Sequence, residues 1–309
     1  MRRPASLLLA VSLAALSLVS ASPALACFGA RPLAMGGAFV AVADDVHATY
    51  WNPAGLVKLS GPEVSATFDT DWQDLNYDIF AGVAAPVGSR AGVGLLYVFN
   101  EDDLGMGVTR TDHLIQAAGA LVLLPWESEA PISFSVGLSG KYLDKDYDIS
   151  GVSDRDHTVD MDVAFLLDAG PSVAPRQRMF SFGLLLQNVT ESSFDFRTMG
   201  RQTFATNVRP AAAFRPDALT TLAVEIYDAT EQVSDRPGLR LGVERWLMGA
   251  GRPLLALRAG AYHINQPELR AYTFGLGLRL TPRSELSYAL MYWTQAEQTT
   301  HLLAAGYRF

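Results

Sequence analysis

Few residues of this 309-residue chain have the types and spacing that catalysis requires. The five histidines fall on separate segments without a Gly-x-Ser-x-Gly turn, and they are His47, His113, His157, His263 and His301. Cys27 is the only cysteine, so neither an intramolecular disulfide nor a cysteine-based metal site can form. The sequence therefore predicts no enzyme, no metal site and no cofactor, although a hydrolase site assembled from His and Ser only in space stays open.

One acidic segment offers a candidate for calcium binding. Asp144, Asp146 and Asp148 alternate as at the start of a calcium loop, but Gly151 comes too late and Arg155 stands where the bidentate acid belongs. We interpret this segment as a solvated acidic loop. The formal net charge of −8 also argues against nucleic acid as a partner, because such binding depends on Lys and Arg neutralising phosphates.

The segment 30–56 holds the residues best suited to binding or gating. It is rich in small residues, which suit close packing in a confined space. Asn52 precedes a proline, so its backbone avoids the helical region, and its side-chain amide can bond backbone groups that a buried segment leaves unpaired. Two interpretations stay open: a latch that a ligand displaces, or a fixed turn that closes a hole.

Two adjacent acids in this segment, Asp44 and Asp45, are expected to pair with basic residues that face the same interior. The candidate partners are Arg258, Arg279, Arg240 and Lys141. We favour an ion-pair network that seats the segment over direct ligand binding. The interior acids expected on the strands are Asp160, Asp162, Glu225 and Glu244. An interior of both signs does not resemble a ring that selects small ions.

The elements that must position these residues are β-strands. After the N-terminus no apolar run approaches the ~20 residues that a transmembrane helix needs. Between residues 62 and 309 the chain divides into about fourteen segments of roughly ten residues, bounded by Gly, Pro, Asp or Asn. In residues 132–142 apolar and small polar residues alternate, which predicts a strand whose two faces meet different environments.

Alternation also describes a soluble β-sandwich, and three further features favour a membrane barrel. Short turns at 86–91, 125–131, 215–219 and 281–284 alternate with long polar loops at 100–112, 144–156 and 188–205. Aromatic residues occupy strand ends, as in interfacial girdles, at Tyr97, Phe99, Tyr142, Trp246, Tyr262, Tyr272, Tyr292 and Trp293. The last strand alternates up to Phe309, an ending typical of clients of the barrel-assembly machinery.

The first residues read as a secretory signal. Arg2 and Arg3 precede an apolar core over 7–19, and a small-x-small site ends at residue 26. The expected domains are a signal peptide at 1–26, an N-terminal plug at 27–60 and a transmembrane β-barrel at 61–309. Acylation of Cys27 as a lipoprotein is the alternative, which the bulky Leu25 beside the cleavage site disfavours.

The letters around Asp44-Asp45 and the run Tyr50-Trp51-Asn52-Pro53-Ala54 resemble the N-terminal plug of FadL-like outer-membrane transporters and of the related PorV-like proteins. The resemblance implies an all-β fold: a single transmembrane antiparallel β-barrel of about 14 strands, with the plug in its lumen. It places the protein in the outer membrane of a Gram-negative bacterium. The implied partners are outer-membrane lipid, a hydrophobic ligand and, through Phe309, the barrel-assembly machinery.

Two functions follow from the resemblance. The first is passage of hydrophobic or amphipathic small molecules, such as long-chain fatty acids or hydrocarbons, gated by the plug. The alternative is a PorV-like outer-membrane component of type IX protein secretion that docks secreted proteins. Under the first function the gate residues are Asp44, Asp45, Asn52, Pro53 and Ala54, and the apolar surface of a ligand pocket comes from Phe39, Tyr50 and Trp51.

Pro210 interrupts a segment that otherwise reads as a strand. Proline removes one hydrogen bond of the ladder, so the sequence predicts a kink or an opening in the wall. In FadL-like transporters a wall kink is the lateral exit for hydrophobic cargo. The other interpretation is that Pro210 lies beside the periplasmic turn at 215–219, where pairing is ending.

Overall fold

The computed structural model describes residues 28–71, 77–126, 131–234, 236–249, 251–265, 268–295 and 297–309. The expected signal peptide, its cleavage site and Cys27 lie outside the described residues. In the part of the chain that is described, no helix is long and apolar enough to span a membrane.

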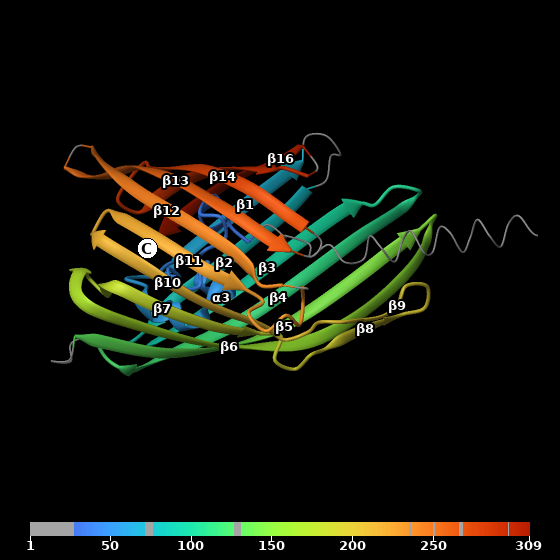
Figure 1. The fold of residues 1–309 in the computed structure, drawn as a ribbon, viewed down its shortest axis with the longest axis horizontal. Coiled ribbons are helices and arrows are strands. Elements are labelled where there is room, and N and C mark those ends of the chain that lie inside the picture. The colour runs from blue at the N-terminus through green and yellow to red at the C-terminus, as the bar shows by residue number, and fades with distance from the viewer. Residues whose placement is uncertain are drawn as a thin grey trace, which may run out of the picture.

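Fourteen strands of the described chain close into one barrel, in which each strand pairs with its neighbours in antiparallel fashion (Figure 1). Pairing of β1 with β16 closes the ring. The strands are β1 (Glu63–Asp71), β2 (Tyr77–Val87), β3 (Ala91–Asp103), β4 (Val108–Leu124), β5 (Ile132–Ile149), β6 (Val152–Ala174), β7 (Gln177–Gln187), β10 (Asn207–Asp217), β11 (Thr220–Tyr227), β12 (Gly238–Gly249), β13 (Arg252–Asn265), β14 (Glu268–Arg279), β15 (Ser284–Trp293) and β16 (Gln298–Arg308). The predicted fold class and strand number are confirmed.

The wall is apolar outside and polar inside, the inverse of a water-soluble protein. On β14, Tyr272 and Phe274 are each 56% exposed, whereas Thr273 between them is fully buried. The acids and bases expected to face the lumen do so, and most are nearly inaccessible: Asp160, Asp162, Glu225, Glu244, Arg240, Arg258 and Lys141. An apolar outer band around a charged interior is the arrangement of an outer-membrane barrel.

The N-terminal segment lies inside this barrel (blue in Figure 1) and forms α2 (Ala30–Ala34), α3 (Ala48–Trp51) and a 3₁₀ helix, η1 (Pro53–Lys58). No residue from Phe28 to Leu59 is exposed. These short helices contact strands on opposite sides of the ring, β3 to β6 on one side and β13 to β15 on the other. The described part of the plug therefore fills the cross-section of the lumen.

Two of the expected long loops are wrong. β3 and β4 continue to Asp103 and Val108, and β5 and β6 continue to Ile149 and Val152, where a two-residue turn joins them. Polar strands remain paired outside the membrane because water accepts polar residues on both faces of a hairpin. Segment 188–205 contains a further hairpin of β8 (Ser193–Phe196) and β9 (Gly200–Thr203).

These extensions form a structure that we call the overhang, comprising residues 101–112, 144–157 and 189–203. It lies beyond the barrel at the outer ends of β5 and β6 (Figure 1). Its own buried cluster consists of Val108, Tyr147, Phe194 and Phe196. The overhang is therefore a packed projection on one side of the barrel mouth.

The predicted aromatic girdle is correct only in part. Tyr97, Tyr142, Tyr272 and Tyr292 are exposed on the outer face, whereas Trp246 and Tyr262 are 8% and 3% exposed and belong to the lumen. The sequence could not separate these groups, because an aromatic near a strand end fits a girdle or a filled lumen equally well.

Candidate functional site

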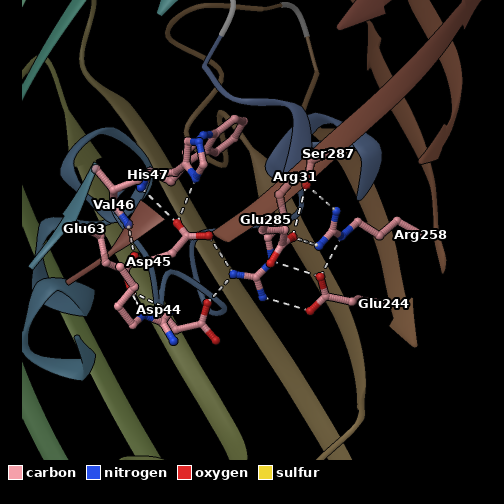
Figure 2. A network of polar contacts seen from close by, with 12 residues as sticks. Arg31, Asp44, Asp45, Val46, His47, Glu63, Glu244, Arg258, Glu285 and Ser287 are labelled. Carbon is pink, nitrogen blue, oxygen red and sulfur yellow. Dashed lines mark hydrogen bonds and ion pairs between the residues drawn. The ribbon is translucent and has the colours of Figure 1, made fainter. Parts of the chain in front are cut away.

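The plug is seated on an ion-pair network centred on Arg31, a residue of the plug itself (Figure 2). Arg31 Nη1 donates to Asp44 Oδ1 at 2.6 Å and to Asp45 Oδ2 at 2.7 Å. Arg31 Nη2 donates to Glu244 Oε1 of β12 at 2.8 Å. One guanidinium thus joins both plug acids to the wall.

Ion pairing of Asp44 and Asp45 is confirmed, but the four expected partners are wrong. Arg258 bonds Glu244 and Glu285, Arg279 contacts Glu285, Arg240 bonds Glu225, and Lys141 bonds Asp162. The plug folds back on itself and brings Arg31 to acids thirteen and fourteen residues further along the chain. A signal existed in the sequence, since Arg31 is the single Arg or Lys between residues 28 and 57.

Burial and pairing act in opposite directions on Asp45 and Arg31. Burial alone would raise the pKa of the Asp45 carboxyl, but the His47 ring and the Arg31 guanidinium, which both bond it, hold that pKa well below its ordinary value. Burial likewise disfavours the Arg31 cation, but Asp44, Glu244 and Asp45 raise its pKa well above the ordinary value. These ion pairs hold the plug, because each charge would be costly to bury without its partner.

Asn52 joins two parts of the plug to the wall. Its Oδ1 accepts from the Ala54 backbone N–H at 3.0 Å and so caps η1. Its Nδ2 donates to the carbonyls of Val40 at 2.7 Å and of Phe165, in β6, at 3.2 Å. The amide therefore pairs with backbone groups, as the sequence predicts.

The substitution Asn52→Ala is expected to loosen the plug without dissolving the barrel. It leaves two buried carbonyls and one N–H without their partner, at a cost of about 2–4 kcal/mol. Hydrogen–deuterium exchange in nanodiscs should show faster exchange over residues 38–59 and unchanged exchange in β14. Gln202→Ala, which removes an amide from the overhang, serves as the control, and equal protection of the plug in both variants would contradict the role of Asn52.

Glycines of the wall receive the backbone of the plug at five points, which we call the socket glycines. A Cβ added to Gly137 of β5 would lie 2.3 Å from the Ala54 nitrogen, and one added to Gly183 of β7 would lie 2.6 Å from the Val40 oxygen. The others are Gly92 of β3, Gly242 of β12 and Gly260 of β13, with nearest plug backbone atoms at 2.2–2.4 Å. This set was not predicted from the sequence, where its signal is glycine at the inward-facing positions of strands with a two-residue period.

Phe39, Tyr50 and Trp51 do come together, as a packed cluster. Trp51 meets Phe39 edge-on at 6.2 Å and Tyr50 at 5.6 Å between ring centroids. Trp51 is 2% exposed and donates from Nε1 to the Phe28 carbonyl. Arg209 and Arg240 lie over the indole at 5.2 and 5.8 Å. Their role in a ligand pocket stays a proposal.

Pro210 interrupts one seam of the wall. β10 pairs with β7 straight through Pro210, which faces Leu184, but its pairing with β11 begins only at Ala211 and Glu225. Pro210 lies three positions from Asn207, at the end of β10 away from the turn at 215–219. The interpretation that placed it beside that periplasmic turn is wrong. Beyond Pro210 the Ala229 N–H donates to the Val208 carbonyl at 2.8 Å, so β10 stays bonded to the residues that follow β11, and a kink or opening in the wall stays a prediction.

Below the network a cavity of about 450 Å³, which we call the vestibule, is lined by plug residues, turn residues and strand ends. It lies at the end of the barrel where short turns join the strands, which is the periplasmic end. Beside it Lys58 bonds Asp168 at 2.9 Å, with both side chains 1% exposed. Among the described residues no group of three or more His, Cys, Asp or Glu could hold a metal ion.

A family model described as type IX secretion system membrane protein PorP/SprF matches residues 47–307. Among solved structures, the toluene transporter TbuX of Ralstonia pickettii superposes with a TM-score of 0.63 at 10% identity, covering 91% of this chain and 98% of that one. The CymD monoaromatic hydrocarbon channel gives 0.66 at 11% identity, with 91% and 97% covered.

A Pseudomonas aeruginosa FadL homologue gives a TM-score of 0.59 at 10% identity, with 92% of this chain and 98% of that one covered. No curated protein matches. At such identities the likeness concerns the fold, which is that of the FadL-like outer-membrane barrels.

Proposed function

Because the chain belongs to the family of type IX secretion system membrane proteins PorP/SprF, we propose that it is a plugged outer-membrane barrel that docks a secreted protein at the cell surface. The protein lies in the outer membrane of a Gram-negative bacterium, where lipid covers its apolar band. The proposal assigns the chemistry of recognition to its outer surface and assigns no catalytic step to any residue.

The filled lumen is the observation that carries this proposal. No residue of Phe28–Leu59 is exposed, and the socket glycines bring plug backbone against wall backbone on five strands. Displacing such a segment breaks the Arg31 network and the bonds of Asn52 together. A barrel closed at this cost suits a docking protein better than a channel that opens often.

The overhang supplies the docking surface in this proposal. It holds eleven Asp and Glu against five Lys and Arg. A cluster under β8 and β9 keeps it rigid, so a partner would meet a preformed surface. Charge complementarity favours a partner with a basic face.

Passage of hydrophobic small molecules is the second candidate, and the seam at Pro210 favours it. The seam lies beside Arg209, which stacks on Trp51 and Tyr227 at 5.2 and 5.7 Å inside the wall. A molecule that entered this cluster could leave sideways into the membrane. The solved neighbours are transporters or channels for aromatic hydrocarbons, and their fold accommodates such passage.

A charge-reversed overhang is expected to lose its partner. Asp103→Lys combined with Asp195→Lys reverses two exposed acids of this surface. A strain without the chromosomal copy is complemented with the wild type or the variant, and proteins at the cell surface are quantified by mass spectrometry. The surface of cells that carry the variant should hold about tenfold less, or lower still, of the docked proteins. The two introduced lysines repel a basic face of the partner.

The matched control is Glu231→Lys combined with Glu297→Lys, two exposed acids outside the overhang, which should leave the surface proteins unchanged. Uptake of labelled toluene and laurate is measured in the same strains. An unchanged surface proteome in the deletion strain would overturn the docking function. Loss of uptake in that strain would move the assignment to transport.

The last strand also keeps its proposed role in assembly. Leu303, Ala305, Tyr307 and Phe309 share the outer face of the β1–β16 seam, and Phe309 is 63% exposed. Such an exposed alternating strand is the feature through which the barrel-assembly machinery would recognise this client.

A further inference from the structure

The vestibule has the size of a ligand site and opens to the periplasm. Its volume of about 450 Å³ falls within the range of small-molecule pockets. Acids and bases from the plug, the strand ends and the turns meet in it, and the two most relevant here are Arg279 and Arg283. Neither the docking surface of the overhang nor the seam at Pro210 includes this cavity.

The acids that line the vestibule already have partners. Asp44 and Asp45 bond Arg31, and Glu244 is shared by Arg31 and Arg258. Glu63 bonds Arg308, and Glu285 bonds Arg258 at 2.9 Å. The capacity of these carboxylates to accept a further cation is therefore largely used.

Two arginines keep unused donors. Arg279 contacts Glu285 only through Nε, at 3.5 Å, which is long for a hydrogen bond. Its terminal nitrogens and the whole guanidinium of Arg283 have no hydrogen-bond partner among the described residues. Arg283 is exposed and lies next to the end of β16, whose Arg308 N–H donates to its carbonyl.

Arg279 is also held in the orientation that oxyanion recognition requires. Its guanidinium lies over the Trp246 ring at 3.9 Å from the centroid. A planar guanidinium stacked on an indole presents its donors edge-on, in a fork that matches the two oxygens of a carboxylate or phosphate. Ordering this side chain in advance lowers the entropy that a ligand would otherwise lose.

We propose that the vestibule binds an oxyanion, a carboxylate or a phosphate group, between Arg279 and Arg283. The site accepts a molecule that arrives from the periplasm, and it does not rest on the docking function of the opposite face. Glu285 is a competing internal anion, because it holds the Nε of the same arginine.

The site is joined to the plug through ion pairs of alternating sign, of which Figure 2 shows those from Glu285 through Arg258, Glu244 and Arg31 to the plug acids. The series of ion pairs begins at Arg279 and continues through Glu285, Arg258, Glu244 and Arg31 to Asp44 and Asp45, and all of these residues except Arg258 line the vestibule. An oxyanion that replaces Glu285 on Arg279 leaves Glu285 to Arg258 and the Ser287 hydroxyl. Occupation of the vestibule therefore changes the charge balance on which the plug is seated.

Calorimetric titration of the full chain in a non-ionic detergent tests the proposal. The probes are inorganic phosphate, hexanoate and N-acetyl-tetraglutamate. We expect saturable binding of at least one probe, weakened about tenfold or more by Arg279→Gln and by Arg283→Gln. Arg283 makes no side-chain bond among the described residues, so its variant keeps the test valid even where Arg279→Gln impairs folding.

Two further variants distinguish binding at this site from non-specific attraction to basic residues at the periplasmic end of the barrel. Arg90→Gln removes an exposed arginine from the β2–β3 turn, outside the vestibule lining, and should leave binding unchanged. Glu285→Gln should strengthen binding, since it removes the competing carboxylate. Absence of saturable binding to the wild type, equal weakening by Arg90→Gln, or weaker binding to Glu285→Gln would each overturn the proposal.

The probes distinguish the sources of the oxyanion. Preferential binding of hexanoate assigns the site to small carboxylic acids, and preference for tetraglutamate assigns it to an acidic segment of a periplasmic protein. Binding of phosphate alone assigns it to a phosphate-bearing molecule. All three results support the same pair of arginines.

Discussion

The substitution Gly137→Val is expected to displace the plug and open the barrel to ions. A Cβ at this position would lie 2.3 Å from the Ala54 nitrogen and 2.5 Å from the Pro53 carbonyl carbon. Both are backbone atoms of a segment that Asn52 ties to β6, so neither can move away alone. Overpacking of this kind costs about 1–3 kcal/mol or more, and here the whole plug bears it.

Planar-bilayer recordings check this result. The wild type should show no steady conductance, and Gly137→Val should show open-channel steps, because a 14-stranded wall without its plug encloses a wide lumen. Gly140→Val is the matched control: it lies on the same strand, faces outward and has nothing within 4 Å of the added Cβ. If both variants remained closed, the prediction would be contradicted, because the backbone around Gly137 would then accommodate the added side chain by a small shift.

The second large effect is expected from Arg31→Met. This change leaves Asp44, Asp45 and Glu244 buried beside one another without the guanidinium that joins them. Removing one partner of a buried ion pair costs about 3–5 kcal/mol where the remaining charge is uncompensated. Glu244 keeps Arg258 in this variant, so Asp44 and Asp45 bear most of this cost. We expect the plug to detach while the wall, held by its own ladders, remains folded.

Limited proteolysis in nanodiscs measures this detachment. Arg31→Met should expose the plug to cleavage from the periplasmic side, and adding Asp44→Asn with Asp45→Asn should restore protection in part. Arg155→Met is the control, since Arg155 pairs with Asp144 on the overhang with 59% of its side chain exposed, and solvent screens such a pair so that it contributes little to stability. Equal cleavage of the Arg31 and Arg155 variants would contradict the central role of Arg31.

The wall could be predicted from the sequence because its pattern is local. Residues on one face of a strand recur every second position, so runs such as Tyr272, Thr273 and Phe274 reveal which side meets lipid before any partner strand is known. The number of strands follows from counting such runs. Where strands end is less local, and the hairpin of β5 and β6 continues well past the expected loop boundary at residue 144.

The residues of the site could be predicted from the sequence, but their ion-pair partners could not. The roles of Asp44 and Asp45 in ion pairing and of Asn52 in backbone bonding were correct, since a buried charge or amide must find a partner. Arg31 was not among the predicted partners, because all four of those lie on strands of the wall. The choice among many arginines in one lumen depends on distances that only the folded plug defines.

An outer-membrane barrel with an internal N-terminal plug could be predicted from the sequence, because the period of two, the small residues of the plug and the polar inner face are properties of single segments. How that plug is held and what surrounds it depend on the folded barrel. Arg31 reaching Glu244, Gly137 receiving Ala54, and Arg279 lying on Trp246 each join segments far apart in the chain. Such contacts arise only when the ring closes, since the closed ladder sets which inward side chains share one level of the lumen.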